Sequence, residues 1–196
     1  MDHTNVNKIL CSTGAIGYYP VNPDAGLMLD VFPRITADGY EVMIDRALPP
    51  NAVPWSARLR EAGIPVGMMH IGKATGELFA TDDPDSHAAG LAKLASDLDI
   101  VRLFGARQAV LHLWGYPGND RHFGRTMASF EDALLLAEDA GVELLVETIP
   151  CVERPLADRL RTLHDAFPAL RFTVDSRLLA LQEAIGSVLE ADWLWD

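Results

Sequence analysis

Four short apolar runs in this sequence each end on a side chain that can bind a metal ion or carry a proton. The runs end at His70, His112, Glu147 and Asp175, and intervals of 42, 35 and 28 residues separate these positions. Helix-like sequence fills each interval. A run buried on both faces is typical of a parallel strand, and successive parallel strands need a helical crossover. Because ligands bind at the carboxyl ends of such strands, the pattern predicts that the four side chains converge on one site.

The same alternation continues along the whole chain. The sequence predicts six strands, over residues 8–12, 40–44, 65–70, 107–113, 142–147 and 170–175. Helices are expected over 24–35, before Gly63, from 82–85 through Val101, over 123–140, from Pro155 and over 178–189. Residues 191–196 resemble the approach to a further strand. The pattern predicts an α/β fold, either an open six-stranded sheet or a (β/α) TIM-type barrel truncated after about six of its eight units.

Length and composition favour one soluble domain spanning residues 1–196. The chain is 49% hydrophobic, yet contains no run of roughly 18 apolar residues that could cross a membrane. The N-terminus lacks the pattern of a signal peptide, so a cytoplasmic location is expected. Two cysteines, Cys11 and Cys151, are too few for a disulfide framework and are predicted to be buried and inert.

The charge excludes one class of partner. The formal net charge is -12, with lysine only at positions 8, 73 and 93. A surface this acidic repels phosphate backbones, so nucleic acid is not expected as a partner. A small-molecule substrate fits this charge better.

Several stretches together resemble the xylose isomerase-like barrel superfamily, in particular its sugar phosphate isomerase/epimerase branch. The resemblance covers almost the whole chain. Its most specific parts are His70 with 77–84, then 105–112, 141–147 and 172–175. It implies that Glu147 and Asp175 bind one divalent cation and that Glu147 transfers the proton. It also implies a histidine near strand seven and a glutamate on strand eight, for which residues 1–196 offer no counterpart. The expectation is therefore a domain that is incomplete at its C-terminus.

The residues leave alternatives open at each position. Glu147 could instead form a structural ion pair, and Asp175 could cap the helix that follows it. His70 and His112 are expected to line the substrate pocket rather than to bind the metal. Glu41, Lys73 and Arg177 are further candidates for substrate contacts. Trp114 and Tyr116 could stack on a sugar or pack in the core.

The function predicted from these residues is a metal-dependent sugar or sugar-phosphate isomerase or epimerase. A cation bound to adjacent hydroxyl and carbonyl oxygens would acidify the C–H bond between them and stabilise an enediolate. Mn²⁺ or Mg²⁺ is the first expectation, with Co²⁺ or Zn²⁺ as alternatives. The rival hypotheses are an endonuclease IV-like phosphodiesterase and a non-catalytic incomplete barrel. With two metal ligands, residues 1–196 alone are expected to be weak in metal binding and turnover. The two open sheet edges leave a homo-oligomer as an alternative.

Overall fold

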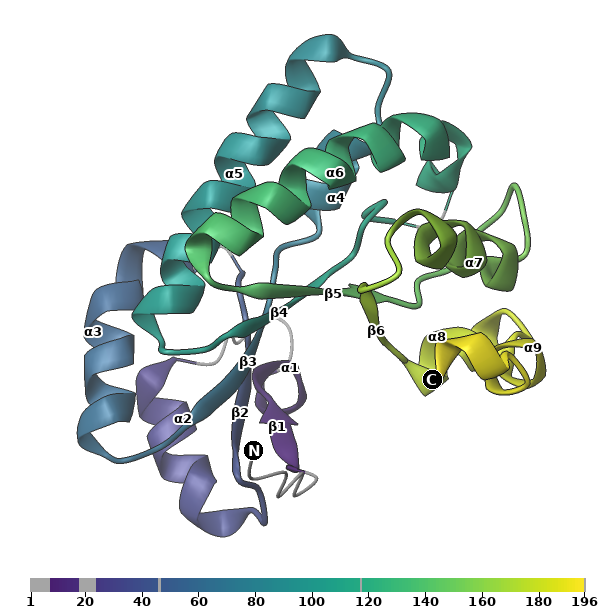
Figure 1. Ribbon diagram of the computed structural model, residues 1–196. Coiled ribbons are helices and arrows are strands. Elements are labelled where there is room, and N and C mark those ends of the chain that lie inside the picture. The colour runs from purple at the N-terminus through teal and green to yellow at the C-terminus, as the bar shows by residue number, and fades with distance from the viewer. Residues whose placement is uncertain (1–7, 18–23, 46, 117, 196) are drawn as a thin grey trace.

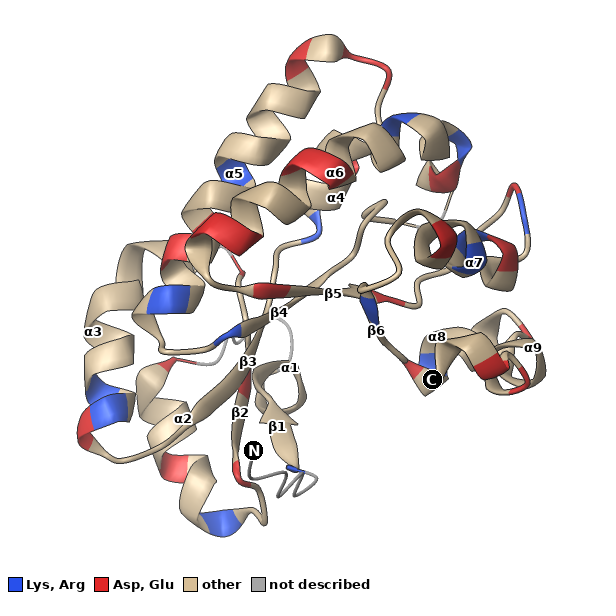
Figure 2. Ribbon diagram, in the orientation of Figure 1, with Lys and Arg blue, Asp and Glu red and all other residues tan. Residues whose placement is uncertain are grey.

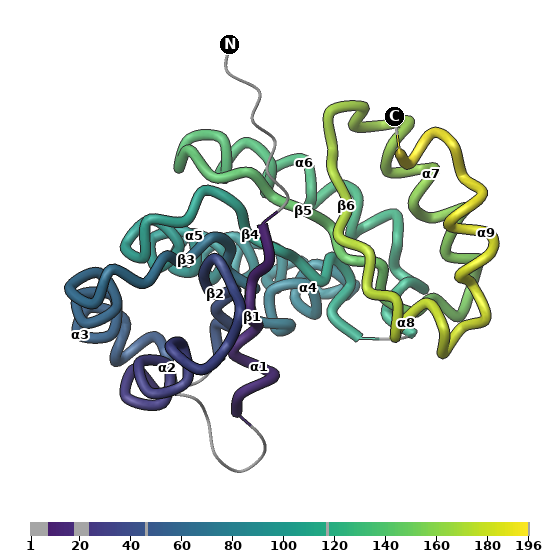
Figure 3. Tube along the Cα trace, turned by 90° about the horizontal axis from the view of Figure 1, so that it is seen from below, coloured from purple at the N-terminus to yellow at the C-terminus, as the bar shows by residue number. Residues whose placement is uncertain are grey.

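The structure is a computed structural model that describes residues 8–17, 24–45, 47–116 and 118–195. Its centre is one curved sheet, with the larger helices following one another around its outer side (Figures 1 and 3). The strands are β1 (Leu10–Ser12), β2 (Gly39–Met43), β3 (Val66–His70), β4 (Gln108–Leu111), β5 (Glu143–Glu147) and β6 (Arg171–Thr173). Every predicted strand is confirmed, with its ends shifted by two residues or fewer.

All neighbouring strands pair in parallel, in the order β1-β2-β3-β4-β5-β6. Within the described residues β1 and β6 therefore form the two edges of the sheet. Burial follows from this order: β4 and β5 are buried along nearly all their length, whereas β1 and β6 are half-exposed. Parallel strands covered on both faces must be apolar, which explains why the apolar runs predicted them.

Helices fill the intervals between strands, as the α/β fold predicts. They are α1 (Thr13–Ile16), α2 (Ala25–Val31), α3 (Leu48–Glu61), α4 (Ala74–Phe79), α5 (Pro84–Leu103), α6 (Phe123–Ala140), α7 (Leu156–Ala166), α8 (Ser176–Leu181) and α9 (Ile185–Leu189), with short 3₁₀ turns η1 (Phe32–Arg34), η2 (Asn119–His122) and η3 (Asp192–Leu194). Charged residues lie mainly on these helices and on the loops (Figure 2). Among the described residues no helix is both long and apolar enough to span a bilayer.

Two predictions at the C-terminal end were wrong. The single helix expected over 178–189 is two helices, α8 and α9, because Glu183 between them adopts a left-handed backbone with φ of 55°. That conformation interrupts the helical hydrogen bonding. The expected strand approach at 191–196 contains instead the 3₁₀ turn η3, and Trp193 of this turn stacks near His164 of α7, with 5.2 Å between ring centroids.

The sequence also gave no sign of α4, because Gly76 in its middle is a poor helix former. The structure shows why a glycine is needed there. A β-carbon on Gly76 would lie 1.8 Å from the carbonyl oxygen of His112 and 2.6 Å from the amide nitrogen of Gly115. The bare backbone of Gly76 lets α4 pack directly against the loop that follows β4.

We therefore expect Gly76→Ala to destabilise the protein by about 1–3 kcal/mol, the usual cost of overpacking a tight contact. Gly124→Ala in α6 is the matched control, since a β-carbon there meets nothing within 4 Å. The control should be neutral or stabilising by about 0.5–1 kcal/mol, because alanine favours helix more than glycine does. Urea unfolding of the two variants measures both values. Equal stabilities would contradict the close packing of α4.

Candidate metal centre

The carboxyl ends of three central strands bring three buried side chains together. His70 ends β3, His112 directly follows β4 and Glu147 ends β5. Their exposed fractions are 7%, 6% and 6%. Because β3, β4 and β5 are parallel neighbours, their ends meet at the same edge of the sheet. These three residues are referred to below as the triad.

The triad side chains point into one small volume. The Nε2 atom of His70 lies 3.4 Å from Oε2 of Glu147, and Nε2 of His112 contacts the same oxygen. One potential ligand atom from each residue lies within 4.8 Å of the other two. The two imidazole rings meet edge to face, with their centroids 5.0 Å apart.

The far nitrogen of each imidazole has its own hydrogen-bond acceptor. Nδ1 of His70 lies 3.3 Å from Oε1 of Glu41, and Nδ1 of His112 lies 3.3 Å from the carbonyl oxygen of Gly115. The hydrogen bond with His70 lowers the pKa of the Glu41 carboxyl, which keeps it an ionised acceptor. An acceptor at Nδ1 favours the tautomer protonated there, which leaves a lone pair on Nε2.

Three electron-pair donors consequently face one another. Nε2 of His70 and Oε2 of Glu147 are buried and have no hydrogen-bond partner among the described residues. Leaving a buried imidazole nitrogen and carboxylate oxygen unpaired is costly, so buried groups of this kind normally have a partner. A divalent cation among the three atoms would satisfy all of them at once. The triad therefore fits a metal ion, and three protein ligands would leave coordination positions open for substrate.

Asp175 lies in the same cavity as the triad but does not belong to this cluster of ligand atoms. Its Oδ1 accepts hydrogen bonds from the backbone amides of Arg177 and Leu178, at 2.8 and 3.0 Å, and so caps α8. Its Oδ2 lies 3.9 Å from the guanidinium group of Arg177. The capping role that the sequence left open is confirmed. A direct metal contact from Asp175 stays a prediction.

A cavity of about 440 Å³ opens over the triad. All four strand-end residues line it, which confirms that the pattern of apolar runs placed them correctly. The other predicted substrate contacts at its wall are Glu41, Lys73 and Arg177. Their binding roles remain predictions. Ser12 at the end of β1, with Gly14 and Ala15 of α1, also lines the cavity, and no sequence signal singled these residues out.

The two aromatic residues that follow His112 differ in burial: Trp114 lies in the core and Tyr116 lies at the surface. Trp114 is fully buried, packs edge to face on Phe123 with 6.0 Å between centroids, and donates a hydrogen bond to the carbonyl oxygen of Pro150. Its side chain therefore has the packing role that the sequence left open, rather than a place at the substrate. Tyr116 is 47% exposed, and the Lys73 ammonium lies 5.4 Å from its ring centroid.

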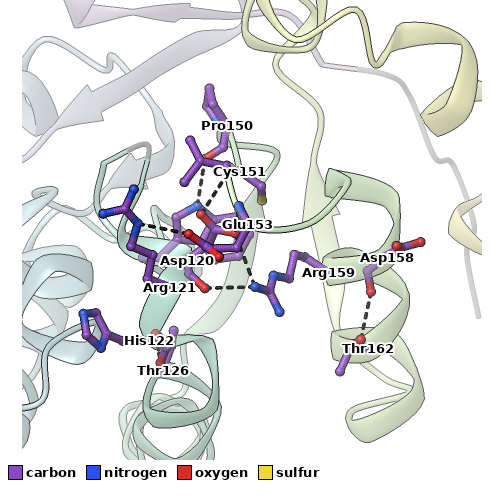
Figure 4. A network of polar contacts seen from close by, with 12 residues as sticks. Asp120, Arg121, His122, Thr126, Pro150, Cys151, Glu153, Asp158, Arg159 and Thr162 are labelled. Atoms are coloured by element: carbon purple, nitrogen blue, oxygen red, sulfur yellow. Dashed lines mark hydrogen bonds and ion pairs between the residues drawn. The ribbon is translucent and has the colours of Figure 1, made fainter.

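A buried polar network lies between two loops that follow the carboxyl ends of strands (Figure 4). Asp120 in η2 is fully buried, and its two carboxylate oxygens accept the backbone amides of Val152 and Glu153. Arg159 of α7 donates both to the Asp120 carboxylate and to its carbonyl oxygen. The network joins the loop after β4 to the loop after β5. Asp120 was missed at the sequence level because it sits in a polar loop segment with no periodic pattern.

The cysteines have no part in the triad. Both are free and half-buried, so the fully buried positions expected for them are only partly found. Burial, with the Asp120 carboxylate as a second cause, raises the pKa of the Cys151 thiol to about 12. This thiol is consequently protonated, and unreactive as a nucleophile, at neutral pH.

The contact between Glu41 and His70 leads to a prediction about metal affinity. Replacing Glu41 by glutamine removes the anionic acceptor at Nδ1 but preserves the size of the side chain. Loss of such a supporting contact typically weakens metal binding by about 10–100-fold. We expect a loss in this range for Glu41→Gln in a Zn²⁺ titration against a chromophoric chelator. Glu77→Gln, on α4 and outside the triad cavity, is the control and should bind as the wild type does; equal affinities for both variants would contradict the supporting role.

Comparisons with known proteins agree with this architecture. No family model and no curated protein sequence matches the chain. Solved structures do match: a 3-keto-D-glucoside 4-epimerase from E. coli has a TM-score of 0.68 at 14% identity, over 94% of this chain and 74% of that one. An L-ribulose 3-epimerase has a TM-score of 0.69 at 18% identity, over 90% of this chain and 63% of that one. A xylose isomerase domain protein from Planctomyces limnophilus has a TM-score of 0.57 at 17% identity, over 77% and 59%.

These identities are low, so the likeness establishes the fold. The chain has the α/β architecture of the xylose isomerase-like barrels, as the resemblance implied. It spans about three-fifths to three-quarters of the length of these three structures.

Proposed function

We propose that this chain carries the metal centre and part of the substrate site of a sugar or sugar-phosphate isomerase or epimerase. The observation that carries the proposal is the triad, in which three buried electron-pair donors face one another. Two of them have no hydrogen-bond partner among the described residues. The fold shared with sugar epimerases supports the substrate class.

The triad would hold the cation through Nε2 of His70, Nε2 of His112 and a carboxylate oxygen of Glu147. Two imidazoles and one carboxylate suit Zn²⁺, Mn²⁺, Co²⁺ or Fe²⁺ better than Mg²⁺, which prefers oxygen ligands. The sequence placed Mg²⁺ among the first candidate cations, whereas this donor set makes it the least favoured of the four cations considered there. It also revises the expected affinity upward, because the sequence suggested only two protein ligands.

When bound, the cation would polarise adjacent hydroxyl and carbonyl oxygens of the sugar and so acidify the C–H bond between them. Glu147 would take the proton at its carboxylate and, in an isomerisation, return it to the neighbouring carbon on the same face. An epimerisation would need a second acid on the opposite face of the sugar to supply the returning proton. Lys73 and Arg177, at the wall of the cavity, would orient the substrate through its hydroxyl or phosphate oxygens. The near-complete burial of the triad would restrict water at the reacting carbon.

A metal-dependent phosphodiesterase is the second candidate, and the two-histidine, one-glutamate triad is the observation that favours it. Two other features oppose it. The third position after Asp175 is Leu178, where the endonuclease IV-like branch has a histidine, and the net charge of -12 repels a nucleic-acid backbone.

One experiment separates the two candidates. The metal-stripped protein is reloaded with Mn²⁺, Co²⁺ or Zn²⁺ and incubated in D₂O with a panel of ketoses and aldoses, while proton NMR follows exchange at carbon. A parallel sample contains a chromogenic phosphodiester. Metal-dependent deuterium uptake that Glu147→Gln abolishes is the expected result. Phosphodiester hydrolysis without any carbon exchange would overturn the proposal in favour of the second candidate.

A further inference from the structure

A second cavity opens beside the triad. It has a volume of about 520 Å³ and shares Met43, His70 and Lys73 with the first. Its other walls come from the loop after β2, from α4 and α5, and from Tyr116. Each cavity falls in the size range of sites for small ligands. Because the two share three residues, they lie next to each other at the carboxyl ends of the strands.

Charges of both signs line the described part of this second cavity. Lys73 and Lys93 provide two cations, and Asp45 and Glu77 provide two anions. An anionic group placed here would meet the carboxylates of Asp45 and Glu77, and one of the two ammonium groups, that of Lys93, is already paired with Asp97. The same four side chains offer hydrogen-bond donors and acceptors together, which is what the hydroxyl groups of an uncharged polyol require.

Lys93 is held in this position by a buried partner. Its ammonium donates to both carboxylate oxygens of Asp97, at 3.1 and 2.9 Å, and Asp97 is only 2% exposed. The Thr75 hydroxyl lies 3.4 Å from the same carboxylate. A lysine fixed in this way is a pre-arranged donor at the cavity wall, because little side-chain freedom remains to be lost when a ligand binds.

Tyr116 gives the cavity a partly exposed aromatic face. The residue is 47% exposed, and the Lys73 ammonium lies over its ring at 5.4 Å from the centroid. An aromatic ring with polar groups around it suits a sugar, whose C–H faces are apolar and whose edges carry hydroxyl groups.

We infer that the substrate spans both cavities, with one sugar ring at the triad and a second, uncharged sugar ring against Tyr116. The substrate class would then be a two-ring glycoside rather than a monosaccharide. This inference rests on the proposed function, because it assumes a sugar at the triad, but it depends on residues of the second cavity that the reaction itself does not use.

The test measures binding by calorimetry, with Zn²⁺-loaded protein and two sets of probes. One set contains hexose monosaccharides, and the other contains hexose disaccharides that differ in linkage position and anomer. We expect at least one disaccharide to bind about tenfold more tightly than its component monosaccharides, equivalent to about 1.4 kcal/mol. Tyr116→Ala should remove this advantage, whereas Leu135→Ala, an exposed apolar position on α6 outside both cavities, should preserve it.

The outcomes distinguish this inference from the proposed function. Monosaccharides that bind as tightly as every disaccharide would overturn the second-ring site and leave the proposed function standing. A disaccharide advantage that survives Tyr116→Ala would also overturn it, since the second ring would then lie elsewhere. Failure of both probe sets to bind metal-loaded protein would count against the proposed function, and the two-ring substrate would fall with it.

Discussion

Alanine substitution of His112 is expected to reduce Zn²⁺ affinity by more than the roughly 100-fold that loss of a supporting residue can cost, because it removes one of three direct ligands. His70→Ala and Glu147→Ala should have effects of the same size. Asp175→Asn should change the affinity by about threefold or less. Asparagine caps a helix as well as aspartate does, so this variant removes the negative charge and keeps α8 in place.

Competition with a chromophoric chelator measures these affinities, and His87→Ala serves as the histidine control. His87 lies on α5, outside the triad cavity, where it contacts Ser129 and Asp132. Far-UV circular dichroism and the urea midpoint verify that each variant is folded. If Asp175→Asn weakens binding as strongly as Glu147→Ala while His112→Ala does not, then the metal pair implied by the family resemblance is correct and the triad is not the centre.

The strand-end residues could be predicted from sequence because burial determines both their strands and their positions. β4 and β5 are covered on both faces, so they read as continuous apolar runs, and the first polar residue after each run marks its carboxyl end. His112 and Glu147 were located in this way without knowledge of any contact. The parallel direction of neighbouring strands followed because each strand is joined to the next by a helical crossover.

The division of roles among these residues could not be predicted in the same way. Sequence position places His70 and Asp175 at equivalent strand ends, yet His70 faces Glu147 while Asp175 turns a carboxylate oxygen toward the amides of α8. Which of the two approaches the other donors depends on local backbone direction and on competing hydrogen bonds. Neither the backbone direction nor the competing hydrogen bonds can be predicted from the spacing of residues in the sequence.

Two further features depend on contacts between segments far apart in the chain. From the sequence alone, Gly76 is expected to break a helix, yet it lies inside α4. A glycine is required there because the neighbouring backbone leaves no room for a β-carbon. Asp120 reads as an ordinary loop residue, although its side chain is fully buried. In both cases a tertiary contact overrides the local conformational propensity. A single sequence does not reveal which distant segment makes that contact.

The burial of Asp120 gives the second large prediction. Asp120→Ala should lower the free energy of unfolding by about 3–5 kcal/mol, the usual cost of removing one partner of a buried ion pair. The amides of Val152 and Glu153 lose their acceptor, at 2.9 and 3.1 Å, and the Arg159 guanidinium loses its carboxylate partner at 3.3 Å, although it keeps the backbone carbonyl of residue 120 (Figure 4). Arg159 is only 15% exposed in its side chain, so water cannot fully replace the lost carboxylate.

The control lies in the same two loops. Arg121 and Glu153 form an ion pair at 3.0 Å, with side chains 67% and 47% exposed. Because exposed pairs contribute at most about 1 kcal/mol, Arg121→Ala should be nearly neutral in the same urea titration. A native domain is stable by only about 5–15 kcal/mol, so the expected loss at Asp120 is a large fraction of the total. Indistinguishable unfolding free energies for Asp120→Ala and Arg121→Ala would mean that other contacts hold the loops after β4 and β5 together.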